Sequence, residues 1–253
     1  MPGAMRNASI FLVLLLLGAA GCDDPKPSGS GATASATQKA SAAPEPPKPK
    51  SMPSLLVDAE GPYLGMERVK MSEPNAAEKL TKLVKALPIE GKPVTLIVEK
   101  KAKIPHVAAV VTELGKAGAP KVILKTDGRN DVPKELSITP ESRVSSTPPP
   151  CSVATMVLKD FSTAVWPIRG GTARKHSKGM AGPDLSNTGR QMEKDLEACD
   201  STMAFFSTDE AVEWEAAYNL AGTLVLSDTK KKIDTLVLLS QVPVAGRPVA
   251  LSK

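Results

Sequence analysis

One order of strand-like and helix-like patterns occurs twice along the chain, which limits the fold to a few arrangements of sheets and helices. In segment 54–139, runs rich in β-branched and aliphatic residues alternate with two amphipathic stretches. Pro105 begins the second amphipathic stretch and Gly118 ends it, as expected for a helix. The expected elements are two strands, a helix, a strand, a helix and a strand: 54–58, 63–64, 75–87, 93–98, 105–117 and 121–125.

Segment 151–253 repeats this order less regularly. We expect its second helix to start near Asp209, with Thr208 as the capping residue and Glu210 in the first turn. The expected strands are 155–158, 164–166, 202–206 and 233–239. The first helix is expected at 188–198 and a long polar loop at 170–183. Together the two segments predict an α+β fold of two tandem small domains, each a mixed β-sheet with two helices packed on one face.

Proline-rich stretches separate these segments from each other and from the start of the chain. Residues 140–150 contain Ser-Ser-Thr-Pro-Pro-Pro, which cannot continue a helix or a central strand. Residues 22–53 are mostly Pro, Ser, Ala, Gly, Lys and Thr, and they bury too little apolar surface to offset the entropy of ordering. We therefore expect a linker at 140–150 and a disordered tether at 22–53, which is either a stand-off from a membrane or a spacer without a selected length.

The N-terminus has the pattern of a secretory signal. Arg6 precedes an apolar run that begins at Ile10, and Cys22 stands directly after Ala-Ala-Gly. The run is shorter than the roughly 20 residues that span a bilayer. The sequence before Cys22 resembles the lipobox of bacterial lipoproteins, which implies that 1–21 is removed and Cys22 is acylated. An ordinary cleaved signal with an incidental cysteine is the alternative. Acylation makes the chain periplasmic and lipid-anchored, and leaves the choice of inner or outer membrane open.

Charge and cysteine content add two constraints. The formal net charge is +5 with Lys and Glu interspersed, and aromatic residues make up 3 % of the chain, which is not the pattern of a nucleic-acid-binding surface. Cys151 and Cys199 remain after lipidation of Cys22. In an oxidising compartment we expect a disulfide between them, with two separate thiols as the alternative.

The stretch 93–126 follows a recognisable order. Its first strand ends near the acidic Glu99, a helix and then Ala117-Gly118 follow, and the last strand closes near Thr126. This order resembles the periplasmic domain of the ExbD/TolR family of biopolymer-transport proteins, and residues 55–64 fit the opening hairpin of that family. The remaining matched positions are apolar: Val107, Val110, Leu114, Val122 and Leu124. The likeness is weaker in the second segment, where it rests on 205–210, Val212 and 236–238.

The resemblance implies the fold and a tendency to pair with a second copy or to bind periplasmic partners, peptidoglycan among them. Members of the family also carry a transmembrane helix whose aspartate takes part in proton-driven work. Here the apolar run contains no acidic residue, and Asp23 and Asp24 follow Cys22, where they cannot replace a membrane-buried carboxylate. Proton conduction is therefore not carried over.

Candidate catalytic and ligand-binding residues are few. His106 and His176 are the only histidines, and neither lies near a carboxylate pair in the sequence, so we expect neither a metal site nor a cofactor. The nucleophile-elbow, phosphate-loop and His-Glu-x-x-His motifs are absent from the sequence. The basic loop 169–178 is either solvated or a contact for an acidic partner or anionic lipid. We expect the three large aromatic residues of the second segment in the core: Trp166, Trp214 and Tyr218.

The sequence thus predicts a non-catalytic, lipid-anchored periplasmic protein. It would be an ExbD/TolR-like accessory or interaction module of an envelope biopolymer-transport system, with envelope proteins or a second copy as partners and without nucleic acid. The alternative is an envelope lipoprotein that binds peptidoglycan or a small ligand in a groove between the two domains.

Overall fold

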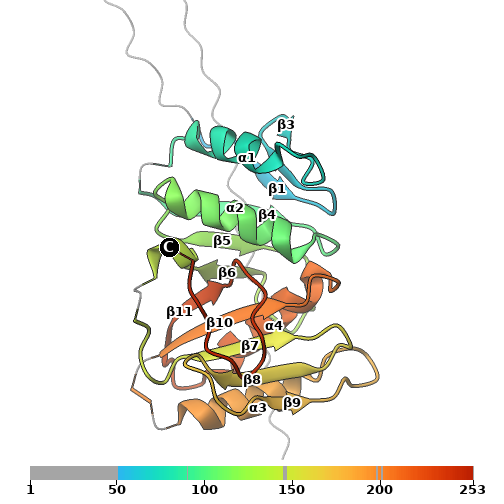
Figure 1. Cartoon of the computed structure of the whole chain (residues 1–253), viewed down its shortest axis with the longest axis vertical. Coiled ribbons are helices and arrows are strands. Elements are labelled where there is room, and N and C mark those ends of the chain that lie inside the picture. Colours follow the sequence, from blue (N-terminus) through green and yellow to red (C-terminus); the bar gives the residue numbers. More distant parts are fainter. Residues whose placement is uncertain (1–50, 90, 145–146, 198, 201, 253) are drawn as a thin grey trace, which may run out of the picture. The chain divides into compact units, whose positions relative to one another are not determined.

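The structure is a computed structural model that describes residues 51–89, 91–144, 147–197, 199–200 and 202–252. These residues form two mixed β-sheets and four α-helices (Figure 1), which agrees with the α+β class. The predicted signal, Cys22 and most of the predicted tether lie outside the described residues. Within the described part, none of the helices is both long and apolar enough to cross a membrane.

Sheet 1 has the strand order β3-β2-β1-β4-β5-β6. The antiparallel β1–β2 hairpin is followed by parallel pairing of β1 with β4 and of β4 with β5. Its strands are β1 (Leu55–Val57), β2 (Pro62–Leu64), β3 (Glu67–Arg68), β4 (Val94–Val98), β5 (Val122–Lys125) and β6 (Glu135–Ile138). Burial alternates along β4, where Leu96 is buried and Ile97 is exposed, so that one face of the sheet packs and the other meets solvent.

Helices α1 (Ala76–Lys85) and α2 (Ile104–Lys116) cover the packed face of sheet 1 (Figure 1). In α1 the buried residues Ala76, Leu80 and Val84 recur every four positions and form one stripe. Pro105 lies in the first turn of α2, and Gly118 follows this helix with a φ of +110°, a conformation that favours glycine. Both signals were expected from the sequence, and both helices lie where they were predicted.

Sheet 2 has the strand order β11-β10-β7-β8-β9 and the same pairing directions as sheet 1, with no counterpart of β6. Its elements are β7 (Val153–Val157), β8 (Thr163–Pro167), β9 (Arg174–His176), α3 (Leu185–Leu196), β10 (Thr202–Thr208), α4 (Trp214–Ser227) and β11 (Ile233–Leu238), and the short 3₁₀ helix η1 (Glu141–Arg143) precedes them. The repeated order that the sequence predicts therefore appears as two sheets of equivalent topology.

The outer face of sheet 2 is covered by the end of the chain. Residues 240–252, here called the C-terminal strap, cross this face (dark red in Figure 1). Strap residues Val249 and Leu251 pack with a buried cluster from the sheet that includes Trp166 and Phe205. The two ends of the strap meet at the buried Glu141, whose carboxylate accepts hydrogen bonds from the N–H groups of Ser240 (2.8 Å) and Ser252 (2.6 Å).

Among the described residues such a cover lies on sheet 2 and not on sheet 1, and side-chain identity explains the difference. Thr95 of β4 and Phe205 of β10 each lie three residues before the end of their strand, on the face away from the helices. Thr95 pairs with Ile123 and is exposed, whereas Phe205 pairs with Val237 and is fully buried. Burying a phenylalanine side chain stabilises the fold by about 2 kcal/mol relative to leaving it in water, whereas a threonine gains much less. A cover over Phe205 is therefore favourable, and Thr95 can remain exposed.

The two sheets meet at β6 and β11. The N–H of Thr139 donates to the carbonyl of Leu236 (2.9 Å), and the indole N–H of Trp214 donates to Thr126 Oγ1 (2.8 Å). One buried cluster takes in apolar side chains from both sheets. The predicted division into domains at 54–139, 140–150 and 151–253 stays a prediction.

Three local expectations differ from the structure. The loop expected at 170–183 contains β9, and a strand, β6, follows the element expected to be the last of the first segment. Thr208 does not cap a helix, because it is the buried last residue of β10 and pairs with Val157. Helix α4 starts at Trp214, with Glu213 as its N-cap residue.

Candidate functional site

The two cysteines of the second segment lie at disulfide-bonding distance. The Cα atoms of Cys151 and Cys199 are 6.0 Å apart, and the residues are 48 positions apart in the chain. Cys151 lies two residues before β7, and Cys199 lies between α3 and β10. The hydroxyl of Thr202 donates to the carbonyl of Cys151 (2.8 Å). A bond here fastens the end of α3 to the first strand of sheet 2.

The two histidines occupy different halves of the molecule. His106 is half-buried in the first turn of α2, and His176 ends β9 beside Thr163 of β8. Burial lowers the pKa of His106 below its usual 6.5, the nearby Lys103 acts in the same direction, and Asp58 opposes both. The structure does not bring the histidines together. Among the described residues, no cluster of three or more His, Cys, Asp or Glu side chains is arranged to hold a metal ion.

The acidic residues after β10 form a turn. The Asp209 carboxylate accepts a hydrogen bond from the N–H of Ala211 (3.0 Å), and the Asp209 carbonyl accepts one from Val212 (3.0 Å). This turn redirects the chain from β10 into α4, where the N–H of Trp214 donates to the carbonyl of Ala102 (2.9 Å). The Asp209 carboxylate therefore supports the backbone of this turn.

The three large aromatic residues of the second segment, Trp166 in β8 and Trp214 and Tyr218 in α4, belong to the core, as expected. The indole N–H of Trp166 donates to the carbonyl of Arg247 in the strap (3.0 Å). The Tyr218 hydroxyl donates to the carbonyl of Pro133 (2.9 Å), and burial raises the pKa of Tyr218 to about 12. The rings of Trp214 and Tyr218 pack at 6.1 Å between centroids. Every polar atom of these rings has a hydrogen-bond partner, and Trp166 also lines a pocket of about 370 Å³ beside Cys151.

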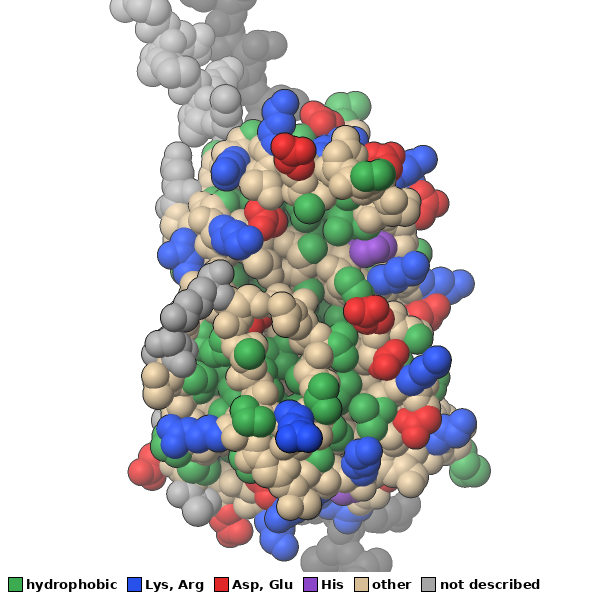
Figure 2. Space-filling view, viewed as in Figure 1, with side chains coloured by type: hydrophobic (Ala, Val, Ile, Leu, Met, Phe, Trp, Pro, Cys, Tyr) green, Lys and Arg blue, Asp and Glu red, His purple; other side chains and the backbone are tan. Residues whose placement is uncertain are grey.

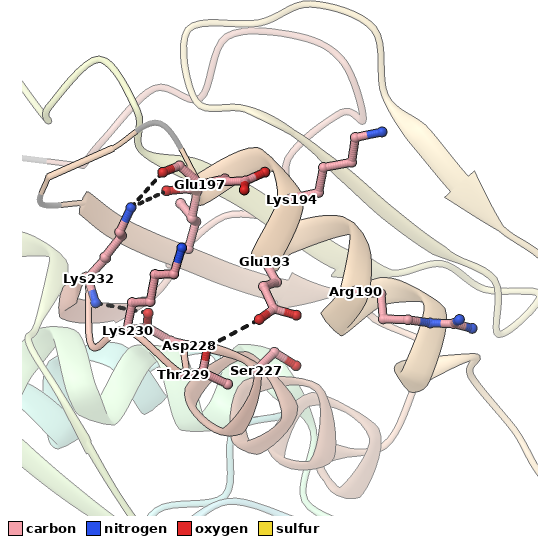
Figure 3. Close-up of a pocket in the computed structure, with 10 residues that line it drawn as sticks. Arg190, Glu193, Lys194, Glu197, Ser227, Asp228, Thr229, Lys230 and Lys232 are labelled. Carbon is pink, nitrogen blue, oxygen red and sulfur yellow. Dashed lines mark hydrogen bonds between the residues drawn. The ribbon is translucent and has the colours of Figure 1, made fainter.

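A cleft of about 360 Å³ lies between the C-terminal ends of α3 and α4 (Figure 3). The Lys232 ammonium donates to the carbonyls of Leu196 (3.1 Å) and Glu197 (2.7 Å), which end α3. The Asp228 carboxylate accepts from the N–H of Lys232 (2.8 Å) and of Ile233 (2.7 Å). In Figure 3 the side chains of Arg190 and Lys194 point away from these groups. Lys232 and Asp228 thus serve the ends of helices that border the cleft, and Lys230 is a further cation of its lining.

A larger cavity of about 830 Å³ lies between the strap and the segment that follows η1. Its walls are largely apolar, with the side chains of Val144, Ile168, Val249 and Leu251. A smaller groove of about 350 Å³ separates α1 and α2 from the two ends of the strap. In Figure 2 apolar side chains gather on this side of the molecule over sheet 2 and around the hollow between the two halves.

The outer edges of the sheets are β3 and β9, since β6 and β11 lie against each other. After β3 the chain continues to pair with the segment before and at the start of β2. The N–H of Val69 donates to the carbonyl of Pro62 (2.9 Å), and the N–H of Met71 donates to the carbonyl of Glu60 (3.1 Å). The N–H of Lys70, between them, consequently faces away from β2. Among the described residues, the outward N–H of Lys70 is the donor that this β3 edge, residues 67–71, offers to a partner strand, while the Lys70 carbonyl accepts from the N–H of Glu73 (3.0 Å).

The basic loop of the sequence contains β9 and leads into a turn that was not singled out. Arg174 pairs with Asp195 (2.7 Å), and the N–H of Gly179 donates to the carbonyl of Gly182 (2.8 Å) to close the turn around Met180. Met180 is fully exposed, and Phe161 in the β7–β8 turn is 41 % exposed. An aromatic residue among turn-forming residues was the available sequence signal for Phe161, but its exposure depends on tertiary structure.

Comparisons of the chain with protein-family models, with curated proteins and with solved structures found no match.

Proposed function

We propose that this chain is a non-catalytic, lipid-anchored periplasmic protein that acts as an ExbD/TolR-like interaction module of an envelope biopolymer-transport system. The observation that carries the proposal is the order of elements around α2. Glu99 follows β4 directly, Ala117 and Gly118 end α2, and Thr126 follows β5. These are the places that the resemblance assigns to the acidic residue, the helix end and the closing strand.

The proposal assigns no proton conduction to the chain, because the apolar run before Cys22 contains no carboxylate. It also assigns no catalysis. The titratable groups of the candidate clusters, among them Asp209, Asp228 and Lys232, are held by backbone groups of their own turns and helix ends. What the described surface offers instead is the outward strand backbone of the β3 edge, with the N–H of Lys70 as its donor.

The proposed mechanism is strand addition at the β3 edge. A partner strand gains main-chain hydrogen bonds there without a special side chain, and alternate side chains add selectivity. The edge is short and carries Arg68 and Lys70, which is typical of edges protected against unselective pairing. A partner must therefore bring carboxylates or a matching length of extended chain.

In-cell cross-linking and affinity capture of the lipidated protein test the function. Recovery of a proton-channel-type membrane protein or of an energy-transducing envelope protein supports the proposal. Recovery of the chain alone, or of wall fragments, contradicts it and favours the alternative.

The edge mechanism has a matched pair of variants. Lys70→Pro removes the outward N–H without breaking a hydrogen bond of sheet 1, and Lys70→Ala keeps that N–H while removing the same charge. We expect loss of the captured partner with Lys70→Pro and retention with Lys70→Ala. Equal capture by both variants refutes strand addition at this edge.

The second candidate function is binding of peptidoglycan or of a small ligand. The observation that favours it is the 830 Å³ cavity beneath the strap, which is within the size range of ligand sites. Co-sedimentation with purified peptidoglycan separates the two functions, since the first does not require wall binding. A Val249→Trp variant, which fills the cavity, should abolish co-sedimentation if the cavity holds the ligand.

A further inference from the structure

The cavity of about 830 Å³ beneath the strap continues the apolar cluster on the outer face of sheet 2. Ile168 is a buried member of that cluster and lines the cavity. Val144, Val249 and Leu251 also line it, and they are only partly buried. The apolar packing of sheet 2 is therefore incomplete on this side, and an apolar ligand that filled the cavity would gain burial free energy there.

Most polar side chains of the cavity wall are engaged within the chain or turned into it. The Glu141 carboxylate accepts the N–H groups of both strap ends, Ser240 and Ser252, and the hydroxyls of these two serines share a hydrogen bond (2.7 Å). The buried Ser142 hydroxyl lies against Gly115 of α2. A sugar would leave many of its own polar groups unpaired in such a site, whereas an acyl chain has none to satisfy.

Arg169 is the exception among the polar groups of the wall. Its side chain is exposed, and it forms no ion pair with another described residue. The described stretches that line the cavity are 141–144, 147–148, 168–169 and 248–252. Glu141 is the one carboxylate in the sequence of these stretches, and strap N–H groups already hold both of its oxygens. The cavity thus combines apolar walls with a cation that no described carboxylate neutralises.

We propose that the cavity beneath the strap binds the acyl chain of a long-chain fatty acid, with the carboxylate of the ligand at Arg169. The apolar walls supply the affinity, and the cation fixes the direction in which the chain enters. The volume is within the range of ligand sites. This inference rests on the second candidate function, ligand binding beneath the strap, and names the chemical class of that ligand.

Calorimetric titration tests the chain-length dependence. The protein is the predicted mature chain 22–253 with Cys22→Ser, so that no attached acyl group competes. The probes are octanoate, decanoate and dodecanoate below their micelle concentrations. Each buried methylene should raise the affinity about fourfold, so we expect a gain of about fifteenfold from each acid to the next. A gain below twofold per step would show that the chain is not buried and would overturn the proposal.

Two strap valines provide a matched pair of variants. Val249 lines the cavity, whereas Val244 is 68 % exposed and does not line it. Val249→Trp should weaken dodecanoate binding at least tenfold, and Val244→Trp should bind as the unmodified chain does. Hydrogen exchange of the unmodified chain provides a measurement that does not depend on how the variants fold. Dodecanoate should slow exchange in the strap and leave α1 and α3 unchanged.

The role of Arg169 has its own comparison. Arg169→Gln should weaken dodecanoate binding by about threefold to fivefold, because the lost contact is an exposed one. The same variant should bind the neutral ligand dodecanol as before. Arg190→Gln, at an exposed arginine of α3, is the control and should change neither affinity.

Four outcomes overturn the proposal. They are equal effects of the two tryptophan variants, protection from exchange outside the strap alone, an equal loss of dodecanoate and dodecanol binding in Arg169→Gln, and absence of dodecanoate binding. If a soluble peptidoglycan fragment binds instead, and Val249→Trp abolishes that binding, the fatty-acid assignment fails while the second candidate function stands. The in-cell capture that tests the first function does not involve the cavity, so its result is independent of this one.

Discussion

At the scale of single residues, Asp184 shows how one carboxylate supports an element. It is the N-cap residue of α3, and it accepts a hydrogen bond from the N–H of Asn187 (3.0 Å) as well as one from the Asn187 side chain. These bonds hold the pKa of Asp184 below its usual 3.8. Because the pKa is lowered in the folded state, the stabilisation is present above about pH 4 and is lost as the pH falls through the folded-state value.

We predict that Asp184→Ala lowers the free energy of unfolding by about 1 kcal/mol at neutral pH. Asp184→Asn keeps an acceptor oxygen, so its free energy of unfolding at neutral pH should fall by less than that of Asp184→Ala. Because the amide does not titrate, the acid-dependent loss of stability that comes from residue 184 should be absent. Urea denaturation at pH 7 and pH 3 measures both. A wild-type and an Asp184→Asn protein with the same acid dependence would contradict the assignment.

At the scale of elements, the sequence predicts those helices and strands whose signals lie within the element or directly beside it. The β-branched run of β4 and the proline and glycine around α2 suffice to locate these elements. Strand β9 consists of Arg174, Lys175 and His176 and has no apolar residue, so that only its pairing with β8 makes it a strand. Thr208, followed by acidic residues, has the local signature of a helix cap, but pairing of β10 with β7 extends the strand through it. Tertiary pairing thus overrides local chemistry at both places.

The same limit applies to the candidate surfaces. The turn residues around Phe161 are visible in the sequence, but the neighbouring position of the turn at Met180 follows from the β8–β9 register. The role of Glu141 is likewise hidden, because its partners Ser240 and Ser252 lie about a hundred residues away and belong to the far end of the chain.

Glu141 provides the prediction for the strap. Glu141→Ala removes the carboxylate that accepts from the N–H groups of Ser240 and Ser252. The loss of these two hydrogen bonds should lower the free energy of unfolding by about 2 kcal/mol. We expect faster hydrogen exchange across 240–252 and a change in Trp166 fluorescence, since Trp166 bonds to the strap. Asp131→Ala, which removes the exposed ion pair between Arg129 and Asp131, is the control. Unchanged exchange in the strap would show that apolar packing alone holds it.

At the scale of the whole molecule, the cysteine pair fixes one end of sheet 2. A disulfide that closes a loop of 48 residues stabilises by about 4 kcal/mol in the chain-entropy model. We predict that Cys151→Ala and Cys199→Ala lower the unfolding free energy by similar amounts, and that the double variant loses no more than either one. Counting alkylatable thiols by mass with and without reductant provides the direct measurement. An unchanged count excludes the bond.

The junction between the sheets decides whether the molecule unfolds as one unit. One buried cluster spans both sheets, and the Trp214–Thr126 hydrogen bond joins α4 to the end of β5. If the sheets unfold together, Thr126→Val should lower the exchange free energy of amides in β4 and in β10 equally, by about 1 kcal/mol. Thr95→Val, on the exposed face of β4, should change neither. If the exchange free energy falls in only one sheet, the two halves unfold separately, as two tandem domains would. In a molecule that unfolds as one unit, a broken contact lowers the unfolding free energy measured at amides of both sheets.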